Sequence, residues 1–266
     1  MSNSDVEFDR NNKLVTSWLF SPLVLGSIRL AIAIYALATL LVALIWPAVR
    51  LDEDSGEFFS FFTNLTFIGI CAYFFASGVQ TIFFALKGRE GSTEASYPLK
   101  GWPRFLRYLH VLLLTTVTTY PILVTIVFWI LLASSETFAT TFSSWSNISK
   151  HALNAVFALF EIIFTNIAQA PWIDLPVTIV ILAMYLGLAY LTKATQGFYH
   201  PKKQGAKLAA YIIGILVGHI IVFVVVFGAI KLRERLTKGK GETSGGKGLL
   251  TSDTEKRSTE GTNEAV

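Results

Sequence analysis

Six apolar stretches, each about as long as a membrane is thick, constrain the fold of this chain more than any motif. A helix rises ~1.5 Å per residue, so roughly 20 apolar residues are needed to cross the ~30 Å hydrocarbon core of a bilayer. Stretches of this length favour helices, because a helix satisfies its own backbone polar groups in lipid. The sequence therefore predicts an all-α, polytopic membrane helix bundle with six transmembrane helices, approximately Leu23–Val49, Phe58–Leu86, Phe105–Ala133, Lys150–Ile167, Val177–Ala194 and Ala206–Leu232.

The composition supports this class and divides the chain. Hydrophobic residues make up 53% of the sequence and charged residues 15%, with a mean hydropathy of +0.54. We expect a cytoplasmic N-terminal segment at 1–22, a six-helix transmembrane domain at 23–232 and a cytoplasmic tail at 233–266. The tail is too polar to bury a core and is predicted to be disordered. The net charge of +4 is attributed to segments facing anionic lipid, not to a nucleic-acid surface.

The basic residues beside the membrane predict the orientation of the bundle. Six spans put both termini on one side, and that side carries twelve Lys and Arg near the membrane against six on the other. Positive residues favour the cytoplasmic side, so both termini are expected in the cytoplasm. A five-span alternative, in which Lys150–Ile167 is re-entrant, would account for the basic fifth connection but would export the basic tail. Six spans are the preferred reading.

The second span carries a group of polar side chains. Within the otherwise apolar stretch Phe58–Phe74 lie Ser60, Thr63, Asn64 and Thr66. A threonine in a membrane helix ordinarily bonds its hydroxyl to the carbonyl one turn back, and that is the default expectation here. A catalytic role would require a base at the same depth on another helix, because a threonine hydroxyl is a poor nucleophile by itself.

His151, near the start of the fourth predicted span, is the candidate for that base. The topology runs the second and fourth spans in the same direction, so Thr66 and His151 both fall in the outer half of the membrane. Thr66 would lie roughly 12 Å below the boundary and His151 only a few Å. Helix tilt and side-chain reach would have to close that gap, and Thr63 is nearer to His151 in depth. A single histidine at a helix start is otherwise an interfacial or capping residue.

Two other features of the spans have structural interpretations. Arg29 lies early in the first span and is expected to extend its side chain to the nearby headgroups. Four threonines between Thr115 and Thr119 precede Pro121, which removes one helical hydrogen bond. We interpret the threonines as packing residues that also satisfy the backbone freed by the proline.

Four segments, in this order and spacing, resemble the androgen-induced integral membrane protein family, and the fuller patterns FFTNLTF and HALNAVFALFEI resemble its fungal branch. The similarity covers roughly residues 23–232 and leaves out both tails. The segments are NLTFIGICAYFF (Asn64–Phe75), YPILVTIVFWILL (Tyr120–Leu132), SKHALNAVFALFEIIF (Ser149–Phe164) and LAYLTKATQGFYHP (Leu188–Pro201).

The resemblance implies an activity and two site residues. Animal members of the family are multi-spanning threonine hydrolases that cleave fatty acid esters of hydroxy fatty acids. Their nucleophile is the threonine of an L-T-F segment, which is Thr66 here, and their essential histidine precedes a glutamate by ten residues, which corresponds to His151 and Glu161. Glu161 lies about three turns from His151, too far to orient its ring. The longer tail, the different second loop and the TNLTFIG lead-in depart from the animal pattern, which leaves the substrate open.

Two function classes follow. The leading hypothesis is a membrane-embedded lipid ester hydrolase in which Thr66 attacks the carbonyl and His151 accepts its proton. The alternative is a non-catalytic multi-pass protein, either a small-solute transporter or a lipid-binding or structural subunit. Transport usually needs charges or broken helices that line a path, and the spans offer only Arg29, Glu161 and Lys193 as charged candidates.

The sequence implies few partners beyond the bilayer and a lipid substrate with long acyl chains. We predict no cofactor and no metal site, since His110, His200 and His219 lack metal-ligand spacing and the single Cys71 cannot form a cysteine cage. The compartment is expected to be the endoplasmic reticulum, with the plasma membrane second. The oligomeric state is left open, because the Gly214–Gly218 small-residue spacing supports helix packing without establishing dimerisation.

The orientation can be tested with an impermeant thiol reagent on variants that carry a single cysteine at Ser55 or Ser92. We expect Ser55→Cys to react from outside and Ser92→Cys to be protected, because the twelve-to-six basic bias puts residue 92 in the cytoplasm. The opposite labelling pattern would refute the topology.

Overall fold

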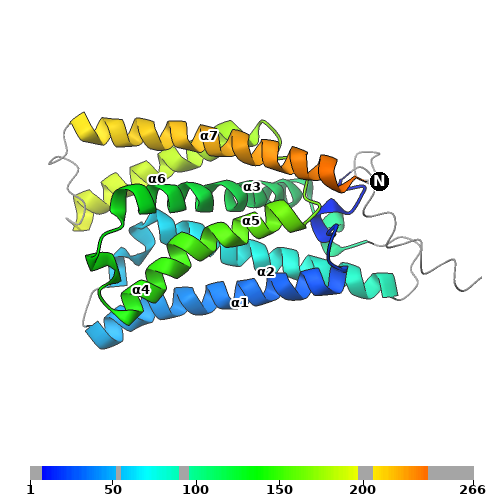
Figure 1. The fold of residues 1–266 in the computed structure, drawn as a ribbon, viewed down its shortest axis with the longest axis horizontal. Helices are drawn as coiled ribbons and strands as arrows, with labels where there is room; N and C mark the ends of the chain where they lie inside the picture. Colours follow the sequence, from blue (N-terminus) through cyan, green and yellow to red (C-terminus); the bar gives the residue numbers. More distant parts are fainter. Residues whose placement is uncertain (1–7, 52–54, 90–95, 197–205, 239–266) are drawn as a thin grey trace, which may run out of the picture.

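The computed structural model describes residues 8–51, 55–89, 96–196 and 206–238, and these form an all-α bundle (Figure 1). Successive helical passes run in alternating directions along the long axis, and the described part of the chain contains no strand, only one isolated β-bridge between Ser17 and Thr165. The helices are α1 (Pro22–Trp46), α2 (Phe62–Arg89), α3 (Arg104–Val127), α4 (Thr141–Ile148), α5 (Asn154–Phe164), α6 (Asp174–Gln196) and α7 (Ala206–Thr237).

Three π-helical turns extend or join these helices. Pro47–Leu51 continues α1, Phe128–Leu132 continues α3, and Ser149–Leu153 links α4 to α5 in one unbroken helical pass. Short 3-10 segments lie at Lys13–Val15, Ser55–Ser60, Pro98–Gly101 and Glu136–Phe138. A π-turn inside a helix is rare and is often found at functional sites.

Five of the described helices are long and apolar enough to cross a membrane, so the chain is a multi-pass integral membrane protein. They are Pro22–Arg50, Phe62–Gly88, Arg104–Leu132, Asp174–Thr192 and Ala209–Thr237. They correspond to five of the six predicted spans. The fourth predicted span, Lys150–Ile167, is not among them.

The fourth pass begins earlier in the sequence than predicted. Its helix starts at Thr141, where the Thr140 side chain caps the Ser143 backbone N–H, and it ends at Phe164. The predicted start at Lys150 was wrong because a capping box makes a polar stretch helical, which the apolar pattern alone does not reveal. His151 therefore lies ten residues inside the helix, roughly 15 Å from its start.

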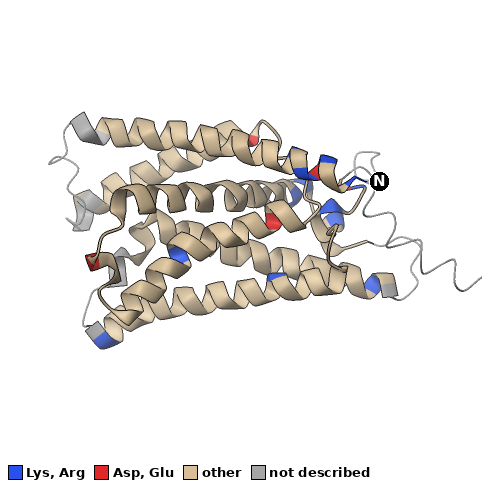
Figure 2. Ribbon diagram, viewed as in Figure 1, with Lys and Arg blue, Asp and Glu red and all other residues tan. Residues whose placement is uncertain are grey.

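The N-terminal segment and the end of α7 meet at one end of the bundle, where charged residues gather (Figure 2). Lys13 forms a salt bridge of 2.8 Å with Glu234. Arg233 donates to the Ile167 carbonyl. The helix α7 extends to Thr237, so the first residues of the predicted disordered tail are helical, and 239–266 lie outside the described residues.

The extramembrane residue Tyr97 adds a further contact at this end. Its hydroxyl donates to the Asp9 carboxylate. Burial and the adjacent Asp9 carboxylate raise the pKa of the Tyr97 phenol.

Two glycines bring α1 and α2 close together. A Cβ at Gly26 would lie 2.8 Å from the side chain of Ile82, and a Cβ at Gly78 would lie 2.8 Å from that of Leu30. Because each glycine admits a large side chain of the other helix, the two backbones approach closely. The GxxxG spacing of α7 works differently: Gly218 faces Leu123 of α3, while Gly214 faces open space.

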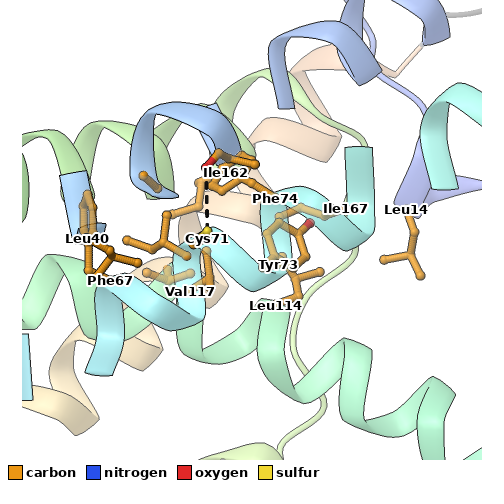
Figure 3. Close-up of a cluster of buried hydrophobic side chains, with 14 of the residues drawn as sticks. Leu14, Leu40, Phe67, Cys71, Tyr73, Phe74, Leu114, Val117, Ile162 and Ile167 are labelled. Carbon is orange, nitrogen blue, oxygen red and sulfur yellow. Dashed lines mark hydrogen bonds between the residues drawn. The ribbon is translucent and has the colours of Figure 1, made fainter. Parts of the chain in front are cut away.

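The core lies between α1, α2, α3 and α5, and one side of α7 (Val222, Val226 and Ile230) also packs into it. Figure 3 draws part of it, in which Leu40, Phe67, Leu114 and Ile162 each come from a different one of these helices. The peripheral helices α6 and α7 are much less covered. In their most apolar 18-residue stretches, 11% and 22% of the residues are buried, against 56% in α3. Their exposed apolar side chains suit contact with lipid.

Pro121 does not interrupt α3, and the threonines before it do not repair its missing bond. The proline leaves the Val117 carbonyl without its helical donor. The hydroxyls of Thr115 and Thr119 instead bond carbonyls of residues 111 and 115. Thr115 also donates to Asp174 at the start of α6, at 2.5 Å. The predicted repair of the kink was therefore wrong, and the cluster contributes packing and an interhelical contact.

The glycine packing generates a stability prediction. Gly78→Ala should destabilise the protein by about 1–3 kcal/mol, because its Cβ would overlap Leu30. Gly187→Ala in α6 is the matched control: nothing lies within 4 Å of its added Cβ, and alanine is the better helix former by about 1 kcal/mol. Thermal unfolding in detergent measures both, and equal melting temperatures would contradict the close α1–α2 approach.

Candidate active site

Thr66 lies on the second turn of α2, in the half of the bundle away from the charged end. Its side chain is 7% exposed. Its hydroxyl donates to the Thr63 carbonyl, three residues back, at 2.9 Å. This is the local hydrogen bond expected of a threonine in an apolar helix, and it can be exchanged for another acceptor by rotation about one side-chain bond.

His151 sits in the π-helical turn Ser149–Leu153 and is 8% exposed. Its ring stacks on Phe128, with 3.6 Å between ring centroids and 8° between planes. The neighbouring Trp129 donates its indole N–H to the backbone carbonyl of His151 at 3.1 Å. The ring is therefore held by the π-turn at the end of α3, while its Nδ1 is buried and has no hydrogen-bond partner among the described residues.

The register of α2 against the fourth pass brings Thr66 and His151 to similar heights. The two segments run in the same direction (Figure 1). Tyr73 bonds Glu161, 88 residues later, and the Phe74 ring lies 6.2 Å from that of Phe157, 83 residues later. These offsets place His151 level with residues 63–68 of α2, and the π-turn that carries it contacts α2 directly.

No hydrogen bond joins the Thr66 and His151 side chains, both of which the structure describes. The predicted pair is thus brought to one level without being bonded. The sequence placed His151 only a few Å below the membrane boundary because it put the helix start at Lys150. The observed start at Thr141 removes the predicted difference in depth between His151 and Thr66.

Other buried polar atoms near this level also have no partner. Asn154, one turn after His151, accepts the Thr125 hydroxyl with its Oδ1 at 2.9 Å, but its Nδ2 has no partner among the described residues. Asn64 donates to the Phe58 carbonyl at 2.8 Å, while its Oδ1 is likewise unpartnered. Buried polar atoms are usually satisfied, so several unpaired ones at one level mark a place where a ligand or water can bind.

Glu161 serves a separate ion pair deeper in the bundle. Arg29 donates from Nε and Nη2 to both Glu161 carboxylate oxygens, at 2.8 and 2.7 Å, and both side chains are fully buried. Arg29 Nη1 also donates to the Leu14 carbonyl and the Thr81 hydroxyl. The expectation that Arg29 extends to the headgroups was wrong, because a paired interior partner holds it. Glu161 is committed to Arg29 and does not orient His151.

A second hydroxyl–imidazole pair was missed from the sequence. Thr178 Oγ1 and His219 Nε2 are 2.8 Å apart, and both side chains are fully buried between α6 and α7. The Tyr120 hydroxyl donates to the Thr178 carbonyl at 2.7 Å and so ties α3 to the pair. The two residues are 41 positions apart on different helices, and nothing in their spacing signals that they meet.

A cavity of about 170 Å³ lies at the charged end of the bundle, away from both pairs. Phe8 and Lys13 of the N-terminal segment, Thr115 of α3 and Gln169 before α6 are among its lining residues. It contains neither Thr66 nor His151, so it does not serve the predicted site.

The chain matches no protein-family model, no curated protein and no solved structure. The resemblance to the androgen-induced integral membrane protein family therefore stays a prediction, carried by the quoted segments.

The Arg29–Glu161 pair generates a double-mutant prediction. Glu161→Gln should destabilise the bundle by about 3–5 kcal/mol, because it leaves the Arg29 charge buried without compensation. The double variant Arg29→Met/Glu161→Leu removes both charges and should recover much of that loss. Thermal unfolding in detergent compares the three proteins. If the double variant is less stable than Glu161→Gln, the buried charge is not the source of the loss.

Proposed function

We propose that the protein is a membrane-embedded hydrolase of lipid esters, with Thr66 as nucleophile and His151 as general base. The observation that carries the proposal is the placement of His151: a π-turn positions its ring, with a buried unpartnered nitrogen, level with Thr66. A base with an unengaged nitrogen can accept a proton, and the hydroxyl needs such a base to attack. The L-T-F resemblance supports the choice of Thr66.

The reaction follows a two-step acyl transfer. As Thr66 Oγ1 attacks the ester carbonyl carbon, His151 takes the hydroxyl proton. The bond between the carbonyl carbon and the alkoxy oxygen then breaks, and the imidazolium gives its proton to the leaving alcohol. Water attacks the acyl-threonine ester with His151 again as base, and the fatty acid leaves as Thr66 regains its proton.

The surrounding bundle supports a lipid substrate. Phe67 and Ile70, on the turn after Thr66, are fully buried and belong to the apolar core. Long acyl chains would be solvated by such residues and by the bilayer. Fatty acid esters of hydroxy fatty acids are the substrate that the resemblance implies, with the endoplasmic reticulum as the first proposed location and the plasma membrane as the second. No cofactor enters the chemistry.

In the rival class, a non-catalytic transporter or lipid-binding subunit, Thr66, His151 and the unpaired polar atoms near them would catalyse no reaction. The Arg29–Glu161 pair does not favour transport, because both groups are saturated by fixed partners. Thr178–His219 is a rival site for the same chemistry, since its hydroxyl and ring already lie at hydrogen-bond distance. Thr66 matches the L-T-F segment of the resemblance and Thr178 does not, so we prefer Thr66 and His151.

Hydrolysis and probe labelling test the assignment. Thr66→Ala and His151→Ala should each abolish ester hydrolysis by the purified protein, and the double variant should be little worse than either single one, because residues acting as a unit are not additive. Labelling with a fluorophosphonate probe should vanish in Thr66→Ala while the protein still inserts and folds.

Thr63→Ala and Thr178→Ala are the controls. The Thr63→Ala variant should retain most activity, because the Thr63 side chain contributes at most a local hydrogen bond of about 1 kcal/mol. Full labelling of Thr66→Ala would show that the nucleophile has been misassigned. Loss of labelling only in Thr178→Ala would move the site to the second pair, and a wild-type protein that neither hydrolyses nor labels would favour the non-catalytic class.

A further inference from the structure

Lys150 lies in the same π-turn as His151, and its neighbours define where it points. Ser149 shares a hydrogen bond of 2.7 Å with Tyr35 of α1, whereas His151 stacks on Phe128 at the end of α3. Consecutive residues of a helical turn are rotated by roughly 80–100°, so Lys150 lies between the α1-facing and α3-facing directions.

Between the α1-facing and α3-facing directions, a side chain could point either into the bundle or out of it. The burial of neighbouring residues selects the inward direction for Lys150. Asn154, Ala158 and Glu161 are buried and mark the inner face of α5. Lys150 lies four residues before Asn154, and four steps of this rotation make roughly one full turn, so Lys150 lies on the same face. The turn contacts α2, the helix that carries Thr66, and Lys150 is half-buried. Lys150 is therefore directed into the bundle beside the candidate site.

The ammonium group of Lys150 has no anionic partner within the described part of the chain. No hydrogen bond or salt bridge of this side chain joins it to another described residue, and the one buried carboxylate of α5, Glu161, is held by Arg29. The acidic residues at 52–54 lie outside the described residues. An unpaired cation inside a membrane bundle is costly, and such residues usually mark a binding site.

We infer that Lys150 binds the anionic group of a lipid and holds that lipid beside Thr66 and His151. A cation on the inner face, next to unpartnered polar atoms and an apolar core, fits an amphiphile with a long alkyl chain and a carboxylate or phosphate. Lys150 would thus make the site selective for anionic over neutral lipids. That the bound lipid is also the substrate rests on the proposed function; its binding does not.

Binding of three amphiphiles with one alkyl chain tests the inference without requiring catalysis. Hexadecanoate, hexadecyl phosphate and hexadecanol are titrated into the full-length protein in neutral phosphatidylcholine nanodiscs. At least one anionic compound should bind ~10-fold or more tightly than the alcohol, as a charge-assisted hydrogen bond allows. Lys150→Gln should abolish this preference, and Lys150→Arg should keep it. Which anion loses affinity identifies carboxylate or phosphate as the recognised group.

Lys100→Gln is the matched control, because Lys100 lies over the Tyr97 ring at the opposite end of the bundle. It should leave the preference unchanged. An unchanged preference in Lys150→Gln, or equal binding of all three compounds by the wild type, would overturn the inference.

Hydrolysis separates this inference from the proposed function. A fatty acid ester of a hydroxy fatty acid is compared with the same lipid whose carboxylate is replaced by a carboxamide. Lys150→Gln should lower kcat/KM for the acid ~10-fold or more relative to the amide. Equal loss for both would assign Lys150 to the chemistry or the fold and overturn its role in selectivity. Lys150-dependent binding without hydrolysis in the wild type would refute the proposed function alone.

Discussion

The buried pair between Arg29 and Glu161 is the interaction on which the rest of the bundle depends. Two charges removed from water carry a desolvation cost of several kcal/mol each, which only good geometry and further hydrogen bonds offset. Here both carboxylate oxygens accept from the guanidinium, and the Leu14 carbonyl, the Thr81 hydroxyl and the Tyr73 hydroxyl complete the set. The pair therefore ties α1, α2, α5 and the N-terminal segment to a single arrangement.

That arrangement fixes the position of the candidate site. Glu161 can meet Arg29 and Tyr73 only at one register of α5 against α2, and ten residues earlier in the same helix this register sets the height of His151. The π-turn then rotates three consecutive side chains so that Ser149 faces α1 and His151 faces α3. The Arg29–Glu161 pair and the candidate site at Thr66 and His151 are thus separate in space but connected through one helical pass.

The two ends of the bundle have different chemistry. The end with the N-terminal segment holds the salt bridge between Lys13 and Glu234, the Tyr97–Asp9 contact and the small cavity. The other half holds Thr66, His151 and aromatic contacts such as Trp129 stacked on Phe138, which suit a membrane interface. At the charged end, by contrast, Phe8 and Lys13 of the N-terminal segment line the cavity.

The sequence by itself determined the class and most of the spans, because apolar length is a local property that needs no partner. Five of its six spans coincide with helices long enough to cross a membrane. It also singled out Thr66 and His151, through the family resemblance and the direction of their spans. The local pattern did not reveal the helical start at Thr141, where a side-chain cap outweighs polar composition.

Only the tertiary structure decided how the polar residues pair. From the sequence, Arg29 near a span end is expected at the headgroups. In the structure it pairs instead with Glu161, 132 positions later. Thr178 and His219 meet because α6 and α7 pack together, and neither residue's neighbours in sequence encode that contact. The π-turn likewise decides that Ser149 bonds Tyr35 of α1 while His151 stacks on Phe128 of α3. Each of these depends on which helix lies opposite, and a hydrogen bond between helices is set by their packing and not by the periodicity of either one.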